Sequence, residues 1–172
     1  MKKVILVGYM AVGKTTIASL LSEKIGLKMV DLDNLIEEKT NLSVSEIFEQ
    51  KGEIFFRKVE HDFFKELIEK DEQLIISTGG GTPCYANNHL LINSNNTISI
   101  YLKASIPIIF ERLKSDKINR PLVVNQSDEE LKEFIAKHLF ERSYFYNQAT
   151  FKISVDNKNP EIIVREIIQL LN

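Results

Sequence analysis

The sequence has little cysteine and no tryptophan. Its single cysteine, Cys84, cannot form an internal disulfide or join a cluster of cysteines around a metal. Chains without structural disulfides are typical of reducing compartments, so we expect a cytoplasmic protein. A nucleophilic Cys84 has no histidine partner that the sequence can assign, and an unreactive thiol is the favoured interpretation.

Long apolar runs and a strong charge imbalance are also absent. No apolar stretch approaches the length of a membrane span, and 22 basic against 24 acidic residues leave a net charge of −2. We therefore expect no membrane and no nucleic-acid partner, and any bound anion must be held by local lysines and arginines. The 172 residues, 44% of them hydrophobic, fit a single domain over 1–172.

The most informative segment is 8–15, which reads GYMAVGKT and matches the phosphate-loop pattern G-x-x-x-x-G-K-[ST] without a mismatch. Gly8 and Gly13 let the main chain curl so that several N–H groups converge on a phosphate chain. Lys14 can then reach the β- and γ-phosphates, and Thr15 can offer its hydroxyl to Mg²⁺. The helix that begins near Gly13 points its positive end at the same anion.

Two other interpretations of this segment are possible from the sequence. A glycine-rich turn can match the pattern by chance, and Met1-Lys2-Lys3 before an apolar run resembles the start of a signal peptide. The apolar run is broken by Gly8, however, and no cleavage site of small residues follows it. The context, a strand-like segment before the loop and a helix-like segment after it, favours the phosphate loop.

Strand-like and helix-like segments alternate along the rest of the chain. The predicted strands are 2–7, the apolar run that ends at Asp31, 74–77, 98–102 and 151–155. The predicted helices are 14–24, 34–39, a helix from the capping box of Ser43 and Glu46, 53–70, 86–92, 106–113, 127–146, and a last one from Pro160. Five short strands separated by helices predict an α/β fold with a parallel sheet covered on both faces.

Two acids, Asp31 and Asp33, end the second strand. Parallel-sheet proteins place groups that contact ligands at this position. Asp33 is also placed to cap the helix 34–39, but capping explains only one of the two acids.

Two further stretches favour a ligand pocket. Gly79, Gly80 and Gly81 follow the third strand, and three glycines are more than a turn needs, so a close approach of a ligand to the backbone explains them better. The region from 48 to 64 is rich in phenylalanine. Most of these rings are expected in the core, while Phe48 and Phe56 are candidates for lining a pocket.

Three arginines allow two interpretations each. Arg57 shares a helix face with Glu53, Glu60 and His61, and the spacing alone favours a solvated ladder of charges. Arg142 falls on an otherwise apolar helix face, where it either reaches out to solvent or faces a buried anion.

The third, Arg120, lies in the polar segment 114–125. A lid over a reacting phosphate and an ordinary surface loop would both have this composition.

In this order the motifs resemble the shikimate kinase family, small P-loop kinases of the nucleoside monophosphate kinase type. The resemblance covers nearly the whole chain. The phosphate loop alone indicates only a nucleotide, whereas the other five motifs in this order are specific. The motifs are 8–15, Asp31-Leu32-Asp33, Phe56-Arg57 with Glu60, Gly79-Gly80-Gly81, Arg120-Pro121-Leu122 and Glu141-Arg142.

The resemblance implies a three-layer αβα P-loop fold whose five-stranded parallel sheet has the order 2-3-1-4-5. It also implies transfer of the γ-phosphate of ATP to the 3-hydroxyl of shikimate, with Mg²⁺, on the route to chorismate and the aromatic amino acids. The chain would be a single kinase domain with a lid at about 114–125. We expect it to act as a monomer on two small molecules, ATP and shikimate.

The resemblance further implies residue roles, and it reverses the interpretation of Arg57 as a solvated charge. Catalytic roles fall on Lys14, Asp33 and Arg120, and the metal is assigned to Thr15 and Asp31. The implied ATP contacts are Gly8, Met10, Ala11, Val12, Gly13, Lys14, Thr15, Thr16, Arg112, Arg120 and Lys158. The implied substrate contacts are Asp33, Phe48, Phe56, Arg57, Glu60, Gly79, Gly80, Gly81 and Arg142.

The chain departs from the family pattern at Asn147 and Lys158, where arginines are common. Two rival functions remain open at this point. A gluconate-type kinase would share the phosphate loop and lid, but it has no evident need for Asp33, Arg57 and Arg142 together. A nucleotide-switch protein is disfavoured because the segment 157–160, NKNP, lacks the aspartate of the guanine-reading Asn-Lys-x-Asp pattern.

Overall fold

The computed structural model describes residues 2–115 and 126–171. A parallel five-stranded sheet forms its centre, in the order β2-β3-β1-β4-β5, which confirms the predicted order. Both β1 and β3 are buried along their whole length. The strands are β1 (Lys3–Val7), β2 (Lys28–Asp31), β3 (Leu74–Ser77), β4 (Thr97–Lys103) and β5 (Phe151–Ser154).

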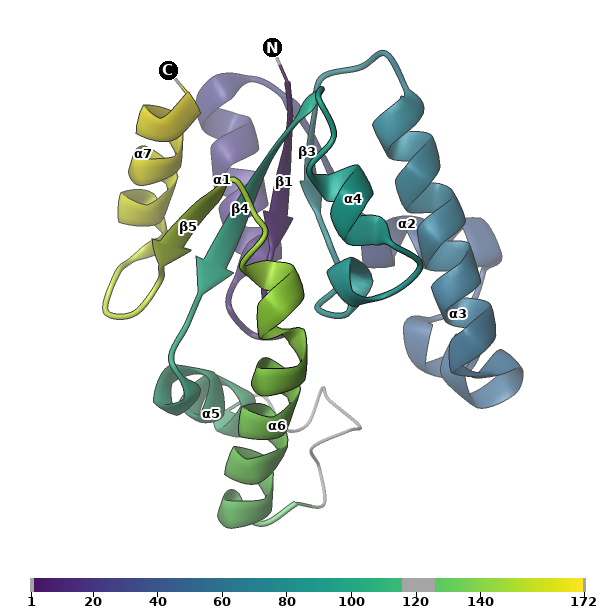
Figure 1. Ribbon diagram of the computed structural model, residues 1–172, viewed down its shortest axis with the longest axis vertical. Helices are drawn as coiled ribbons and strands as arrows, with labels where there is room; N and C mark the ends of the chain where they lie inside the picture. The colour runs from purple at the N-terminus through teal and green to yellow at the C-terminus, as the bar shows by residue number, and fades with distance from the viewer. Residues whose placement is uncertain (1, 116–125, 172) are drawn as a thin grey trace.

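Helices cover both faces of the sheet, because strands as apolar as these need cover on each side. Figure 1 shows α1 behind the sheet and α4 in front of it. α1 packs against β1, β2, β3 and α7, while α4 contacts β4 and α3. The helices are α1 (Lys14–Ile25), α2 (Leu32–Thr40), α3 (Val44–Glu69), the 3₁₀ turn η1 (Thr82–Cys84), α4 (Asn88–Ile92), α5 (Ile106–Ser115), α6 (Asp128–Tyr146) and α7 (Pro160–Leu171).

Local signals placed most helix ends correctly. Both predicted capping boxes form, at the starts of α3 and α6, and Pro160 opens α7. The helix predicted from Ser43 and the helix predicted at 53–70 form the single element α3, which is kinked between them at Gly52, where φ is 81° and ψ is 169°. The predicted start of α4 at residue 86 is wrong, because Ala86 and Asn87 have φ angles of 48° and 57°, which no right-handed helix contains.

The predicted cap of α2 is also wrong. Asp31, not Asp33, is the N-cap, and its carboxylate accepts hydrogen bonds from the backbone N–H groups of Asp33 and Asn34. The helix therefore starts two residues earlier than predicted. As a result Asp33 lies in the first turn of α2, and its side chain is available to the site.

The sheet register brings the functional motifs to one edge. Ser77 of β3 pairs with Leu6 of β1 on one side and with Asp31 of β2 on the other. The phosphate loop, the acid pair and the glycine turn therefore leave the sheet at the same level, at the carboxyl ends of the strands. This is the lower edge in Figure 1, opposite both chain termini. Over residues 2–115 and 126–171, no helix has the length and apolar character that crossing a bilayer requires.

Candidate active site

The phosphate loop has the strained backbone that its pattern predicts. Gly8 has φ 148°, and a β-carbon there would stand 2.6 Å from the carbonyl oxygen of Leu102. Gly13, the N-cap of α1, has φ 96°. Both angles are unfavourable for residues with side chains, so the two glycines are needed for different reasons, space and conformation at Gly8 and conformation alone at Gly13.

Two cations hold the loop. The Lys14 side chain is buried, and its Nζ donates hydrogen bonds to the carbonyls of Gly8 (2.8 Å) and Tyr9 (2.9 Å). Nη1 of Arg112, from α5, donates to the carbonyls of Ala11 (3.2 Å) and Val12 (3.0 Å). The first turn of α1 reads KTTI and adds no negative charge. The start of α1 thus presents a positive helix end and an ammonium group, which suits a phosphate.

A cavity of about 480 Å³ lies over this loop. Its lining includes most of the implied ATP contacts, the acids Asp31 and Asp33, and two of the three glycines, Gly79 and Gly80. Asn34 and Thr78, which the sequence did not single out, complete the lining. The lining residues are Met10, Ala11, Gly13, Lys14, Thr15, Thr16, Asp31, Asp33, Asn34, Thr78, Gly79, Gly80 and Arg112.

Thr15 and Asp31 lie where a metal ion could be held. The Thr15 hydroxyl donates a 2.7 Å hydrogen bond to Oδ2 of Asp31, while Oδ1 of the same carboxylate caps α2. Hydroxyl and carboxylate oxygens beside a phosphate site fit Mg²⁺, which prefers oxygen ligands and commonly takes only one or two from protein. The capping bonds also fix the direction in which the Asp31 carboxylate points.

Asp33 has an unusual electrostatic environment. Burial raises the pKa of its carboxyl from 3.8 to about 6, helped by the negative charges of Asp31 and Glu60 and opposed by the positive charges of Lys14 and Arg57. Its Oδ1 atom would lie only 3.1 Å from a β-carbon on Gly79. An acid tuned toward neutral pH inside a cavity is typical of a general base.

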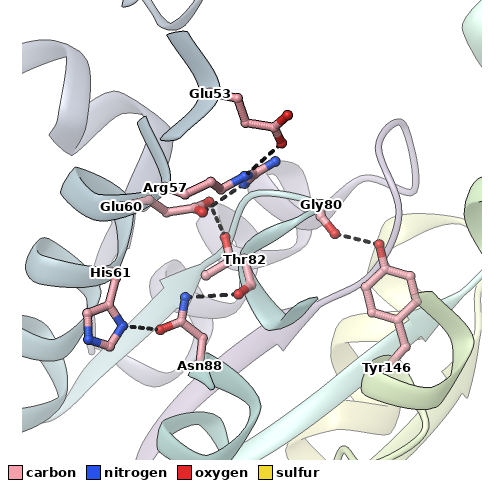
Figure 2. Close-up of polar contacts among 8 residues, drawn as sticks. All are labelled: Glu53, Arg57, Glu60, His61, Gly80, Thr82, Asn88 and Tyr146. Atoms are coloured by element: carbon pink, nitrogen blue, oxygen red, sulfur yellow. Dashed lines mark hydrogen bonds and ion pairs between the residues drawn. The ribbon is translucent and has the colours of Figure 1, made fainter. Parts of the chain in front are cut away.

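Arg57 is fixed by a buried network rather than by a solvated ladder, so the interpretation from spacing alone was wrong. Its Nη1 donates to Oε2 of the fully buried Glu60 at 2.8 Å, and its Nε lies 3.4 Å from Oε1 of Glu53 (Figure 2). The other oxygen of Glu60 accepts a 2.6 Å bond from the Thr82 hydroxyl. Both oxygens of Glu60 therefore have protein donors, and this acid positions Arg57.

The same network reaches behind the glycine turn. Nδ2 of the buried Asn88 donates to the carbonyl of Thr82 at 2.9 Å, and Oδ1 of Asn88 lies 2.7 Å from Nδ1 of His61 (Figure 2). His61 was predicted on the face of Arg57, but its polar contact is to α4. The first turn of α4 is thus tied to both α3 and the residue that follows Gly81.

The three glycines are explained by space. They lie outside the left-handed region of φ. A β-carbon at Gly81 would stand 2.6 Å from Nη2 of Arg57. A β-carbon at Gly80 would stand 3.3 Å from the backbone nitrogen of Met10 and 3.6 Å from Nη1 of Arg142. The turn therefore brings the phosphate loop and both arginines together.

Arg142 lies beside the phosphate loop and the glycine turn, a position that favours its interpretation as an anion ligand. Its guanidinium carbon lies 5.6 Å from the ring centre of Tyr9, a residue of the phosphate loop. One helical turn further along α6, the buried Tyr146 donates a 2.5 Å hydrogen bond to the carbonyl of Gly80 (Figure 2). Its ring stacks on that of Tyr101, with centroids 5.1 Å apart. α6 thus fixes the turn and delivers Arg142 to it.

Some residues assigned from sequence lie elsewhere or outside the described part. Phe56 is buried, with its ring centre 4.7 Å from that of Phe48 and the two rings tilted by 39°, and neither ring lines the cavity. Lys158 makes an ion pair with Glu166 of α7 at 2.7 Å. Arg120 lies outside the described residues, as does the predicted lid except for its first two residues, which end α5. Burial raises the pKa of Cys84 to about 11, which fits the unreactive thiol.

Several contributing residues gave no usable sequence signal. Tyr146, Thr82 and Tyr9 act through contacts to distant parts of the chain, and each looks like an ordinary core residue in the sequence. The three glycines before Thr82 indicated a ligand site in this region of the sequence, but they did not indicate a role for Thr82.

A nucleotide-type phosphate loop, an acid with a raised pKa and two converging arginines at the carboxyl edge of a parallel sheet define a P-loop phosphotransferase. A family model described as Shikimate kinase matches residues 10–172. The chain belongs to the shikimate kinase family.

Individual relatives agree over the full length. A shikimate kinase from Flavobacterium johnsoniae is 53% identical over 171 residues, which cover 99% of this chain and 99% of that protein. The crystal structure of shikimate kinase from Bacteroides thetaiotaomicron is 34% identical, with a TM-score of 0.91 over 99% of this chain and 98% of the other. A shikimate kinase from Acinetobacter baumannii in complex with shikimate is 31% identical, with a TM-score of 0.89 over 99% and 93%.

Proposed function

We propose that this chain transfers the γ-phosphate of ATP to the 3-hydroxyl of shikimate and releases shikimate 3-phosphate and ADP. The observation that carries the proposal is the position of Gly80, against the phosphate loop on one side and against Arg142 on the other. A nucleotide site and an anion site therefore adjoin across one turn of backbone. A nucleotide-switch protein would leave the paired arginines without a role. Gluconate also carries a carboxylate, so the gluconate-type alternative is disfavoured instead by the match to the shikimate kinase family over residues 10–172.

On the nucleotide side, the chain supplies charge and orientation, which is most of what phosphoryl transfer requires. The backbone of the phosphate loop and the positive end of α1 bind the phosphate chain, and Lys14 lies beside them. Thr15 and Asp31 would hold Mg²⁺, which when bound neutralises charge on the β- and γ-phosphates. Arg112 borders the cavity and holds the loop carbonyls, and we assign it to the adenine side.

On the acceptor side, Asp33 accepts the proton of the attacking hydroxyl. Its pKa of about 6 leaves it mostly ionised at neutral pH, yet more basic than an ordinary aspartate. Arg57 and Arg142 bind the carboxylate of shikimate, because paired guanidinium groups fix its orientation as well as its charge. Glu60 holds Arg57 in place. Arg120 and Lys158 keep their proposed roles at the nucleotide on the strength of the resemblance.

We also infer the setting of this activity. The chain would work as one kinase domain and as a monomer. Its compartment would be the cytoplasm, where ATP is abundant and a lone thiol stays reduced.

The test is release of ADP with shikimate, with gluconate and with neither. The proposal expects release that depends on shikimate, whereas gluconate-dependent release or slow release without an acceptor contradicts it. Lys14→Ala should lose most of kcat, and Arg57→Ala should mainly raise KM for shikimate. Arg165→Ala, at an exposed arginine of α7, is the matched control and should change neither constant. An equal loss of ATP binding in Arg57→Ala, measured by calorimetry, contradicts the role of Arg57.

A further inference from the structure

Tyr85 covers Arg57 from a segment that no motif includes. It follows η1 directly, four residues after Gly81. The guanidinium carbon of Arg57 lies 4.1 Å from the centre of its ring, closer than to the ring of Phe56, at 5.1 Å. The ring remains 37% exposed, so it forms an outer surface of the site rather than part of the core.

The Glu53 carboxylate acts electrostatically on both Tyr85 and Arg57. Burial raises the pKa of Tyr85, and the nearby Glu53 carboxylate raises it further. Glu53 also lies 3.4 Å from Nε of Arg57. Glu53 therefore lies near both side chains, while the observed contact between Tyr85 and Arg57 is that of the aromatic face with the guanidinium group.

We propose that Tyr85 is a positioning residue for the acid substrate, acting through Arg57. The inference rests on the proposed role of Arg57 as a carboxylate ligand. The ion pairs with Glu60 and Glu53 hold the guanidinium group at two nitrogens along its edge, whereas the ring of Tyr85 packs against its face. An aromatic face at 4.1 Å attracts the cation and holds its plane. A held plane matters because two parallel N–H bonds to a carboxylate must lie in it.

Three substitutions separate the features of the ring. Tyr85→Ala removes it and should raise KM for shikimate about fivefold, with kcat and KM for ATP within about twofold of the wild type. Tyr85→Phe keeps the aromatic face and should retain most of the affinity. Tyr85→Leu keeps bulk without the aromatic face and should behave like Tyr85→Ala. Wild-type constants in the Leu variant would overturn the proposal. Tyr144→Ala, at a tyrosine of α6 that is 68% exposed, is the matched control.

A double-mutant cycle distinguishes this proposal from a general loss of stability. If Tyr85 acts through Arg57, adding Tyr85→Ala to Arg57→Ala should leave KM for shikimate where Arg57→Ala put it. A further fivefold rise in the double variant overturns the proposal. The proposed function fails in a different way, through a wild-type enzyme that shows no shikimate-dependent ADP release. The role of Arg57 fails separately, through an Arg57→Ala variant with wild-type KM.

Discussion

Arg57 and Gly81 are in such close contact that a β-carbon on residue 81 would stand 2.6 Å from Nη2 and 2.9 Å from the guanidinium carbon of Arg57. The absence of a side chain at position 81 is therefore part of how the arginine is placed. Arg57 cannot move far in response, because Glu60 holds it from inside the protein. The site geometry depends on this steric relationship as much as on charge.

Gly81→Ala should displace Arg57 and raise KM for shikimate by on the order of 10- to 100-fold, since small misplacements of a positioning group are costly. KM for ATP should change little. Gly80→Ala is the informative comparison, because its β-carbon would stand 3.3 Å from the backbone nitrogen of Met10 in the phosphate loop. That variant should raise KM for ATP as well. If Gly80→Ala and Gly81→Ala changed KM for ATP and KM for shikimate equally, this would contradict the assignment of Gly80 to the phosphate loop and of Gly81 to Arg57.

The pH dependence of the reaction should reflect the ionisation of the Asp33 carboxyl. Because its pKa is about 6, kcat/KM for shikimate should fall about tenfold per pH unit below that value as the base is protonated. Asp33→Asn should lose about 10²- to 10⁴-fold in kcat, and its residual rate should lack this acidic limb. A steady-state profile from pH 5 to pH 8 measures both. An unchanged acidic limb in Asp33→Asn would assign the titration to another group.

Ionisation of the Asp33 carboxyl should also lower the stability of the folded protein. A pKa raised from 3.8 to about 6 means that the folded state binds the proton more tightly than the unfolded chain does, so ionisation of Asp33 opposes folding. Asp33→Asn should match the wild type below about pH 4, become increasingly more stable than the wild type between about pH 4 and 6, and keep a constant advantage of at most about 3 kcal/mol above that range. Urea unfolding of both proteins at several pH values tests this. A constant difference at every pH would argue against the raised pKa.

The dependence of the rate on Mg²⁺ concentration should show whether Asp31 helps to hold the metal ion. Asparagine caps helices as well as aspartate does, so Asp31→Asn should keep α2 folded while removing the negative charge beside Thr15. If Asp31 holds the ion through water, the Mg²⁺ concentration for half-maximal rate should rise about 10- to 100-fold. Thermal melting without metal should stay unchanged and serves as the control. A large fall in melting temperature with unaltered Mg²⁺ dependence would assign Asp31 to capping alone.

Much of the fold was determined by the sequence alone, because its signals act over a few residues. The phosphate loop, the apolar strands, the capping boxes at Ser43 and Ser127 and the kink at Gly52 depend on neighbours in the chain. The family motifs added the strand order, and the sheet has that order. These features were predictable because hydrophobic period, caps and glycine angles are local properties.

Only the tertiary structure decided how the site is supported. Spacing on α3 favoured a solvated Arg57 and the family motifs reversed that interpretation, but only the structure shows how Arg57 is held, by a buried Glu60 that also bonds to Thr82, 22 residues away. The bond from Tyr146 to Gly80 spans 66 residues, and the ring of Tyr85 meets Arg57 across a turn. Such contacts form where separate elements pack together, so their partners have no fixed spacing in the sequence. Local patterns in the sequence identify the reacting groups, while the packing between helices and strands sets the positions and charges of these groups.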